Sequence, residues 1–564
     1  MKEKIYDVIV VGSGISGGWA AKELTENNMK TLVIERGPQK VHRQDYPHDF
    51  SNPWDLEQRG MVPEQLQESD YATQKKCYVF NEFSRDRFVN DRENPYVQEK
   101  PFDWIRGYQT GGRSLLWGRQ SYRWSDLDFG ANKRDGHGVD WPIRYRDLAP
   151  WYDHVEEFAG ISGNRDNIPQ LPDGIFQPPM PMNCVEKEIK SRIEKAFPER
   201  RMIIGRAAHL TDPKPVHTEL GRGKCQYRNQ CYRGCSFGAY FSSLSATLPA
   251  AERTGNLEMV HDSIARDIIF DPQTGRATGV RVVDRLTLQE RVYRARIIFL
   301  CASTLGSTQL MLNSVSDHFP NGIANRSGAL GRYLMDHTMS AGAFGTVDGH
   351  LDSYYSGRRP NGIYIPRFRN LQRQGEDYLR GFGYQGGAMR PSWQRRGQKA
   401  GIGLALKERL RQPGPWVFHL AGFGEMLPYR HNRVSLDPEK RDRWGIPLLR
   451  IDASWGENER KMREDMASSA VEMLQAVGIG DATPIKQDHA PGLAIHEMGT
   501  ARMGRDPKTS VLNGYNQCHD VKNLFVTDGA AMASSACQNP SLTYMALTAR
   551  AVDHAVKEIR AGRL

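Results

Sequence analysis

A glycine-rich turn close to the N-terminus limits most strongly what this chain can fold into. The mostly apolar residues 6–11 predict a short buried strand, and Gly12, Gly14 and Gly17 follow it before a helical pattern. Gly12 permits a tight turn, Gly14 lets the backbone approach a pyrophosphate, and Gly17 lets the helix pack closely on the strand. The N-terminus of that helix offers free N–H groups and a positive dipole end to phosphates. The turn therefore predicts a unit that binds a nucleotide.

A second strand and an acid at its end complete this pattern. Residues 31–34 are apolar, and the carboxylate of Glu35 at the end of the strand can accept hydrogen bonds from ribose hydroxyls. The glycines alone would be a weak signal, because glycine turns also serve purely structural roles. Together, the two strands, the glycines, the helix and the acid predict a Rossmann-like domain that binds a dinucleotide.

The composition argues against several classes of protein. The 564 residues leave room for two or more domains, and 39% hydrophobic and 25% charged residues are typical of globular proteins. No apolar run approaches the roughly 18 residues of a membrane span, so we expect no transmembrane segment. The net charge of +10 fits an acidic partner, such as an electron acceptor or a membrane surface, or diffuse charge for solubility. We expect no binding of nucleic acid, because long Lys or Arg runs are missing.

The chain enters its first strand almost immediately, which leaves no room for a signal peptide. We therefore expect a cytoplasmic protein, or one that is exported folded together with a partner that carries the signal.

The rest of the chain predicts a mixed architecture. Residues 38–105 lack periodicity and suggest a lid or cap, and residues 257–295 predict a run of strands. Residues 295–312 repeat the strand-to-helix pattern, which indicates a return to the nucleotide domain. Residues 331–490 alternate strand-like and loop segments, with a helix over residues 457–477, and predict an antiparallel sheet with covering helices. The expected fold class is α/β plus antiparallel β.

Two polar residues near the C-terminus suit the oxidation of an alcohol. His496 lies in an apolar, glycine-rich stretch, and Asn539 lies 43 residues further on, before Pro540 and a predicted helix over residues 542–559. A neutral imidazole has a pKa near 6.5 and can take a hydroxyl proton at neutral pH, while an amide can hold the substrate oxygen. Asn539 is also expected to cap the helix, with Pro540 at its first position. A satisfied core histidine is the alternative for His496.

Five stretches, in order along the whole chain, resemble the glucose–methanol–choline (GMC) oxidoreductase family. They are VIVVGSGISGG, GYQTGGRSLLWG, IIFLCASTLGSTQLML, HEMGTARMG and NLFVTDGAAMASSACQNPSLTYMALTARA. The resemblance implies an FAD cofactor and two domains. The FAD domain is discontinuous and would comprise residues 1–40, 105–135, 205–320 and 491–564. The substrate or cap domain, built on an antiparallel sheet with helices, would comprise residues 41–104, 136–204 and 321–490.

The resemblance also implies roles for single residues. His496 would be the base and Asn539 its partner in catalysis, at the start of a helix whose dipole favours the reduced flavin. FAD should be noncovalent, because Leu116 stands where some relatives carry a flavin-linked His. His337 is expected to be structural. The cofactor-binding residues that we expect are Gly12, Gly14, Gly17, Glu35, Gly111, Gly112, Ser114, Asp528, Gly529, Asn539, Pro540 and Ser541.

Three of the eight cysteines form a cluster in the sequence. The spacing of Cys225, Cys231 and Cys235 resembles that in the flavoprotein subunits of bacterial membrane-linked sugar dehydrogenases, where three such cysteines hold a 3Fe–4S cluster. Reduced structural cysteines and a zinc site are the alternatives. Structural zinc usually has four ligands, whereas three thiolates suit a three-iron cluster better. The other five cysteines are scattered and imply no disulfide framework.

Within the family, an Asn at position 539 resembles the branch that oxidises ring hydroxyls of sugars. We therefore expect oxidation of a sugar or glycoside to a ketone, similar to glucoside 3-dehydrogenase, with the hydride passing to flavin N5. The electrons would pass to a non-oxygen acceptor such as a cytochrome c, and a small signal-bearing subunit would carry the chain to the periplasm. A pyranose or glycoside oxidase that uses oxygen, a gluconate-type dehydrogenase, a hydroxynitrile lyase and a catalytically idle flavoprotein are the alternatives.

Overall fold

The computed structural model describes residues 4–353, 361–391 and 401–564, and its first sheet is organised around β1 (Ile5–Val11). β1 pairs in parallel with β2 (Thr31–Ile34) on one side and with β8 (Glu290–Leu300) on the other. β5 (Leu257–Val260) extends the sheet beyond β2, and β18 (Leu524–Val526) pairs with the end of β8. A parallel sheet is covered on both faces, which is why every residue of β2 is buried.

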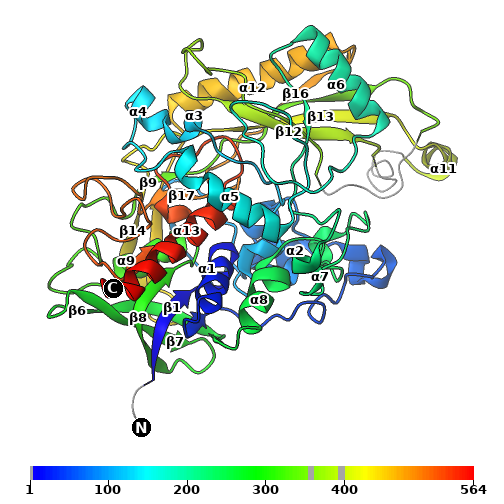
Figure 1. Ribbon diagram of the computed structural model, residues 1–564. Helices are drawn as coiled ribbons and strands as arrows, with labels where there is room; N and C mark the ends of the chain where they lie inside the picture. The colour runs from blue at the N-terminus through cyan, green and yellow to red at the C-terminus, as the bar shows by residue number, and fades with distance from the viewer. Residues whose placement is uncertain (1–3, 354–360, 392–400) are drawn as a thin grey trace.

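Three helices cover one face of this sheet. α1 (Ile15–Glu26) leaves the glycine-rich turn and packs against α8 (Leu248–Glu252) and α13 (Ser541–Arg560), as Figure 1 shows. Apolar side chains of β1 and α1 share one buried core with side chains of α13. The N-terminal and C-terminal segments of the chain therefore build one domain together.

The antiparallel edge of the same sheet differs in one respect from the sequence prediction. β6 (Ser263–Asp271), β7 (Arg276–Asp284) and β8 follow one another through antiparallel pairing. The sequence predicted a run of strands that ends at residue 295 and a new strand that begins there, but β8 continues through this residue without a break. Its first half pairs with β7 and its second half with β1, so both halves find hydrogen-bond partners without a break.

A six-stranded antiparallel sheet forms the other end of the molecule (Figure 1, top). α12 (Glu457–Ala476) and α6 (Cys184–Ala196) cover it, and methionines of α12 pack on the buried residues that alternate along the central strand. The strands, in spatial order, are β16 (Thr483–Lys486), β10 (Ala341–Val347), β13 (Trp416–Gly424), β12 (Phe382–Met389), β11 (Ile363–Ile365) and β4 (Ile203–Ile204).

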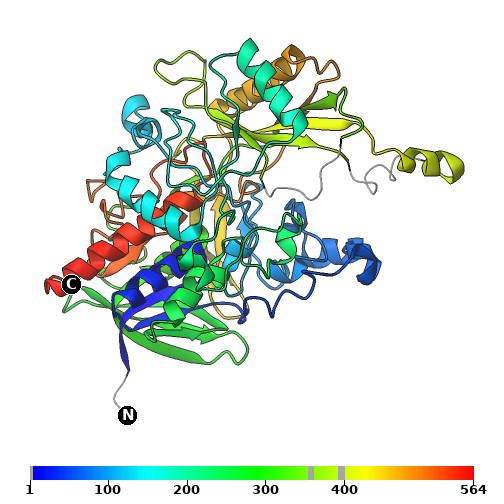
Figure 2. The same ribbon diagram turned by 45° about the vertical axis from the view of Figure 1, so that its right-hand side comes forward.

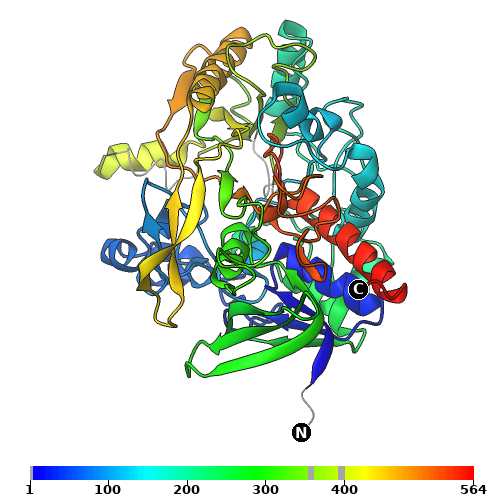
Figure 3. The same ribbon diagram turned by 90° about the vertical axis from the view of Figure 1, so that its left-hand side faces the viewer.

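A third sheet places two distant segments of the chain side by side (Figure 3). Its spatial order is β17 (Met498–Thr500), β9 (Arg332–Met335), β14 (Arg433–Arg441), β15 (Pro447–Asp452) and β3 (Val97–Gln98). β17 and β9 are antiparallel, with Met498 opposite Met335. The residues just after β9 therefore lie beside the residues just before β17. Because the sheet combines segments assigned above to different domains, the domain limits stay a prediction.

The other α-helices of the described residues are α2 (Glu64–Asp70), α3 (Asp126–Phe129), α4 (Ala131–Asp135), α5 (Tyr145–Ala159), α7 (Pro215–Thr218), α9 (Thr304–Asn313) and α11 (Gly403–Arg411). α11 extends away from the body of the molecule in Figure 2. Within the described ranges, every helix is too short or too polar to cross a membrane. The predicted class, α/β plus antiparallel β, is confirmed.

Candidate active site

A cavity of about 1050 Å³ lies between the parallel sheet and the six-stranded sheet. The glycine-rich turn borders it at one end, and residues of β12 and β13 border it at the other. His496 and Asn539 also line it. The cavity thus connects the predicted nucleotide site with the two residues predicted to be catalytic.

The glycines of the turn meet different surroundings. A side chain at Gly17 would overlap the carbonyl oxygen of Gly12, only 1.8 Å from the expected Cβ position. Gly12 has a φ of +96°, and a Cβ there would meet the Cys301 carbonyl oxygen at 2.6 Å. A Cβ at Gly14 would meet nothing within 4 Å and would point into open space. Gly12 and Gly17 therefore make the turn possible, whereas Gly14 leaves room beside it.

Glu35 joins the end of β2 to the turn. Its carboxylate accepts hydrogen bonds from the backbone N–H and the hydroxyl of Ser13 and from the N–H of Gly37. Burial raises the pKa of Glu35 above its ordinary value, although these donors act in the opposite direction. Each carboxylate oxygen has two lone pairs, so Glu35 retains acceptor capacity where it borders the cavity.

The second predicted loop packs directly on the first. Gly111 has a φ of +87° and donates its N–H to the Ser13 hydroxyl at 3.0 Å. The Ser114 hydroxyl donates to the Gly111 carbonyl at 2.6 Å. Gly112 and Ser114 line the cavity, and Gly111 supports them from behind.

Asp528 and Gly529 line the cavity after β18. The Asp528 carboxylate accepts from the Ser307 hydroxyl at 2.5 Å and from the Ala530 N–H at 3.0 Å. Burial raises the pKa of Asp528 to about 6. One end of the cavity combines open space beside glycines, helix N-termini and two buried acids. This combination suits the binding of FAD.

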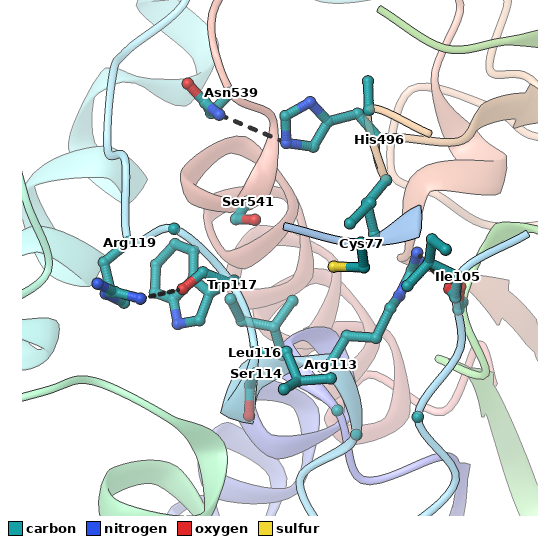
Figure 4. A pocket seen from close by; sticks show the side chains of 18 of the residues that line it. Cys77, Ile105, Arg113, Ser114, Leu116, Trp117, Arg119, His496, Asn539 and Ser541 are labelled. Atoms are coloured by element: carbon teal, nitrogen blue, oxygen red, sulfur yellow. Dashed lines mark hydrogen bonds between the residues drawn. The ribbon is translucent and has the colours of Figure 1, made fainter. Parts of the chain in front are cut away.

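His496 and Asn539 face one another across the cavity, as Figure 4 shows. The Asn539 Nδ2 atom lies 3.4 Å from Nε2 of His496. On its other side, the His496 Nδ1 atom lies 2.8 Å from Nδ1 of His337, whose Nε2 lies 3.1 Å from the Ser535 carbonyl oxygen. Burial lowers the pKa of His496 well below 6.5, and His337 and Arg113 lower it further. His496 is therefore neutral at neutral pH.

The backbone around His496 is held by one buried carboxylate. Asp336 follows β9 and accepts hydrogen bonds from the N–H groups of Gly492, Ala494 and His496, at 2.7, 3.2 and 3.1 Å. Burial and, to a lesser extent, nearby Glu497 raise the pKa of Asp336 to about 7. Asp336 thus fixes the loop that carries the imidazole.

Asn539 does not cap the last helix, so that prediction is wrong. α13 begins at Ser541 with Pro540 in the N-cap position, and no side chain caps it. The Asn539 amide instead bonds outward, because its Oδ1 accepts from Gln385 Nε2 at 2.7 Å. Ser541 lines the cavity, and Pro540 lies behind it.

Sequence reasoning missed several residues that complete the site. Gln385 comes from β12 and contacts Asn539, while Arg113 pairs with buried Glu497 at 2.8 Å beside the cavity. His337 was expected to be structural, yet its ring contacts His496. The sequence signal that could have indicated this contact was the Asp336–His337 dipeptide after a short strand. Its partner strand, however, lies more than 150 residues away in the chain.

The three clustered cysteines lie on one loop near the cavity. Cys231 borders the cavity, and Cys231 and Cys235 border a small cavity beside it. Burial raises the pKa of Cys225 to about 11, with smaller contributions from the other two thiols. In the described ranges, however, no three His, Cys, Asp or Glu side chains are gathered closely enough to hold a metal. The three thiols are therefore not gathered around one point in this structure.

The fold and the site together define a flavin-dependent oxidoreductase acting on CH–OH groups. The chain belongs to the GMC oxidoreductase family, whose N-terminal and C-terminal models match residues 6–339 and 428–548. FAD is the cofactor of this family, in agreement with the cavity described above.

Relatives of known activity match nearly the whole chain. The chain is 27% identical to 2-methyl-1,2-propanediol dehydrogenase of Mycolicibacterium austroafricanum, covering 97% of this chain and 94% of that protein. It is also 27% identical to the fructose dehydrogenase large subunit of Gluconobacter japonicus, covering 99% and 98%. Pyridoxine 4-oxidase from Mesorbium loti has the same fold, with a TM-score of 0.57 and 16% identity over 97% of this chain and 99% of that one.

Proposed function

We propose that this protein oxidises a ring hydroxyl of a sugar or glycoside to a ketone and passes the electrons to an acceptor other than oxygen. The observation that carries the proposal is the pair of His496 and Asn539, whose Nε2 and Nδ2 atoms lie 3.4 Å apart in the cavity. This spacing leaves both atoms able to contact one hydroxyl oxygen placed beside them.

The residues of the chain would divide the work as follows. His496 takes the hydroxyl proton at Nε2, and the Asn539 Nδ2–H donates to the oxygen while negative charge develops on it. Bound FAD supplies the hydride acceptor. The Asp336 carboxylate keeps the loop of His496 in place through three backbone N–H groups, which limits the movement of the base.

The wall opposite the nucleotide end supports a polyhydroxylated substrate. Gln120, Gln385 and Asn361 line it, together with backbone groups of Gly386 and Gly387. Amides both donate and accept hydrogen bonds, which suits a ring that carries several hydroxyls. The relatives named fructose dehydrogenase and gluconate 2-dehydrogenase support the same substrate class.

Substrate-dependent bleaching of the flavin tests this function. We expect purified protein to be yellow and to lose its flavin absorbance anaerobically with a glycoside such as methyl glucoside or with a disaccharide. Recovery of absorbance should be fast with cytochrome c or a dye acceptor and slow with air. A flavin that stays oxidised across a panel of sugars would exclude sugar oxidation. Fast recovery in air would identify an oxidase, as in the relative named paromamine 6'-oxidase.

A 3Fe–4S cluster at Cys225, Cys231 and Cys235 is part of the proposal. It requires their loop to close, because the thiols are not gathered in the arrangement described above. Beside the loop, the buried Arg119 guanidinium lies 4.7 Å from the ring centres of Tyr232 and Tyr240 and would offset thiolate charge.

Iron and sulfide analysis of anaerobically purified protein tests the cluster. We expect about three irons per chain, an electron paramagnetic resonance signal, and loss of both in Cys231→Ser. Cys184→Ser, outside the loop, is the matched control. Less than about one iron per chain would leave three reduced structural cysteines.

We further propose that the chain works with a small signal-bearing subunit in the periplasm. The relatives named fructose dehydrogenase large subunit and gluconate 2-dehydrogenase flavoprotein support a partner subunit. Fractionation of cells that make the protein naturally would decide this, since protein confined to the cytosol argues against co-export.

A further inference from the structure

A chain of hydrogen bonds passes through the side chains of the site and ends at a main-chain carbonyl. The last link joins His337 Nε2 to the Ser535 carbonyl oxygen, at 3.1 Å. A carbonyl oxygen can only accept, so the proton of this bond belongs to His337 Nε2. His337 is fully buried beside this carbonyl, and the neighbouring Ala536 backbone also forms a hydrogen bond with its ring.

The neutral state of His337 settles the next bond. Burial lowers the pKa of His337 to about 4, so at neutral pH its ring carries one proton. That proton is on Nε2, so Nδ1 has a lone pair and must accept. Its partner at 2.8 Å is Nδ1 of His496, which therefore donates. The groups facing these two rings are the Arg113–Glu497 pair, the Phe423 ring and the backbone held by Asp336.

We propose that His337 is a positioning residue that keeps the proton of His496 on Nδ1 and so leaves the lone pair of Nε2 directed into the cavity. A histidine in the other tautomer would present an N–H to the substrate hydroxyl and could not take its proton. His337 thus makes His496 a base at the atom that faces Asn539. The proposal rests on the proposed oxidation of an alcohol at this site.

The hydrogen bonds on the Asn539 side of His496 have donors and acceptors that agree with this tautomer. Asn539 Oδ1 accepts from Gln385 Nε2 at 2.7 Å, so its Nδ2 is the group directed at His496. Gln385 Oε1 in turn accepts from Gln120 Nε2 at 3.0 Å, and Gln120 Oε1 accepts from the Tyr122 hydroxyl at 2.7 Å. Every link then has one donor and one acceptor. Reversing the His496 tautomer would place two N–H groups against each other at Nε2 and two lone pairs against each other at Nδ1.

The tautomer is measured directly in the wild-type holoenzyme. Long-range ¹H–¹⁵N correlation spectra of deuterated, [¹⁵N]histidine-labelled protein show which ring nitrogen carries the proton, and the signals missing in His496→Ala assign the residue. We expect a protonated Nδ1 and a bare Nε2 for His496 near neutral pH. A proton on Nε2 of His496 would overturn the proposal. This measurement needs no substrate, so it remains decisive if no alcohol reduces the flavin and the proposed function fails.

Two substitutions separate positioning from packing. In His337→Asn an amide oxygen takes the place of Nδ1 and can still accept, whereas His337→Leu fills the space without an acceptor. With a sugar that reduces the wild-type flavin, we expect His337→Leu to lower the limiting rate of reduction by about 100-fold or more. His337→Asn should stay within about tenfold of wild type, and the substrate concentration for half-saturation should change little in both. Equal losses in the two variants would assign His337 a purely structural role.

Discussion

Replacing His496 with alanine should leave FAD bound and slow the reduction of the flavin by substrate on the order of 10³-fold. His496 contributes the base of the proposed reaction, and general bases contribute factors of about 10² to 10⁴. Its loop should persist, because Asp336 holds the backbone and not the ring. Rapid-mixing absorbance of the flavin under anaerobic conditions measures this rate.

The pH dependence of the same rate provides a second readout. Only neutral His496 can take a proton, and burial, His337 and Arg113 lower its pKa well below 6.5. When the pH falls through the range near 6.5, where a free histidine would gain its proton, the wild-type rate should therefore remain on its plateau. It should decline only at more acidic pH, and His496→Ala should lack this decline.

His431→Ala is the matched control, because this exposed histidine stacks on Tyr429 away from the cavity. It should reduce its flavin at the wild-type rate. If His496→Ala also does so, His496 is not the base, and the base must be sought among the other groups that line the cavity.

The parts of this site that local sequence patterns predicted are those whose residues are close together in the chain. Gly12, Gly14, Gly17 and Glu35 lie within one strand–turn–helix–strand unit, so their spacing alone places them together. The fold class was predictable for the same reason, because apolar runs and their periods are local.

Contacts that depend on distant pairing could not be predicted in this way. The contact between His337 and His496 depends on the pairing of β9 with β17, and the Gln385 contact with Asn539 depends on β12. The predicted helix cap at Asn539 is wrong because its amide forms hydrogen bonds with side chains that line the cavity instead. The local capping rule considers only the first N–H groups of the helix that follows, whereas the folded structure places both His496 and Gln385 beside this amide.

Two alanine substitutions in the glycine-rich turn should distinguish an effect on protein stability from an effect on FAD binding. In Gly17→Ala the new methyl group would lie 1.8 Å from the carbonyl oxygen of Gly12, so α1 must move away from the turn. Overpacking costs about 1–3 kcal/mol even where side chains can yield, and a main-chain carbonyl yields less. We expect Gly17→Ala to retain no FAD and to melt at a clearly lower temperature even as apoprotein.

Gly14→Ala should behave differently, although it lies three residues away in the same turn. Its backbone is extended, with a φ of −66°, and its Cβ would meet nothing within 4 Å, so the apoprotein should melt like the wild type. The methyl group would instead occupy the open space where the pyrophosphate of FAD approaches, and FAD should bind about tenfold more weakly or worse.

Gly480→Ala, whose Cβ also meets open space but far from the turn, controls for the loss of glycine itself. Flavin content per chain and apoprotein melting measure both properties. Tight FAD binding in Gly14→Ala would mean that the cofactor does not approach the backbone at this residue. If Gly17→Ala and Gly14→Ala lower the melting temperature of the apoprotein equally, Gly14 does not face open space.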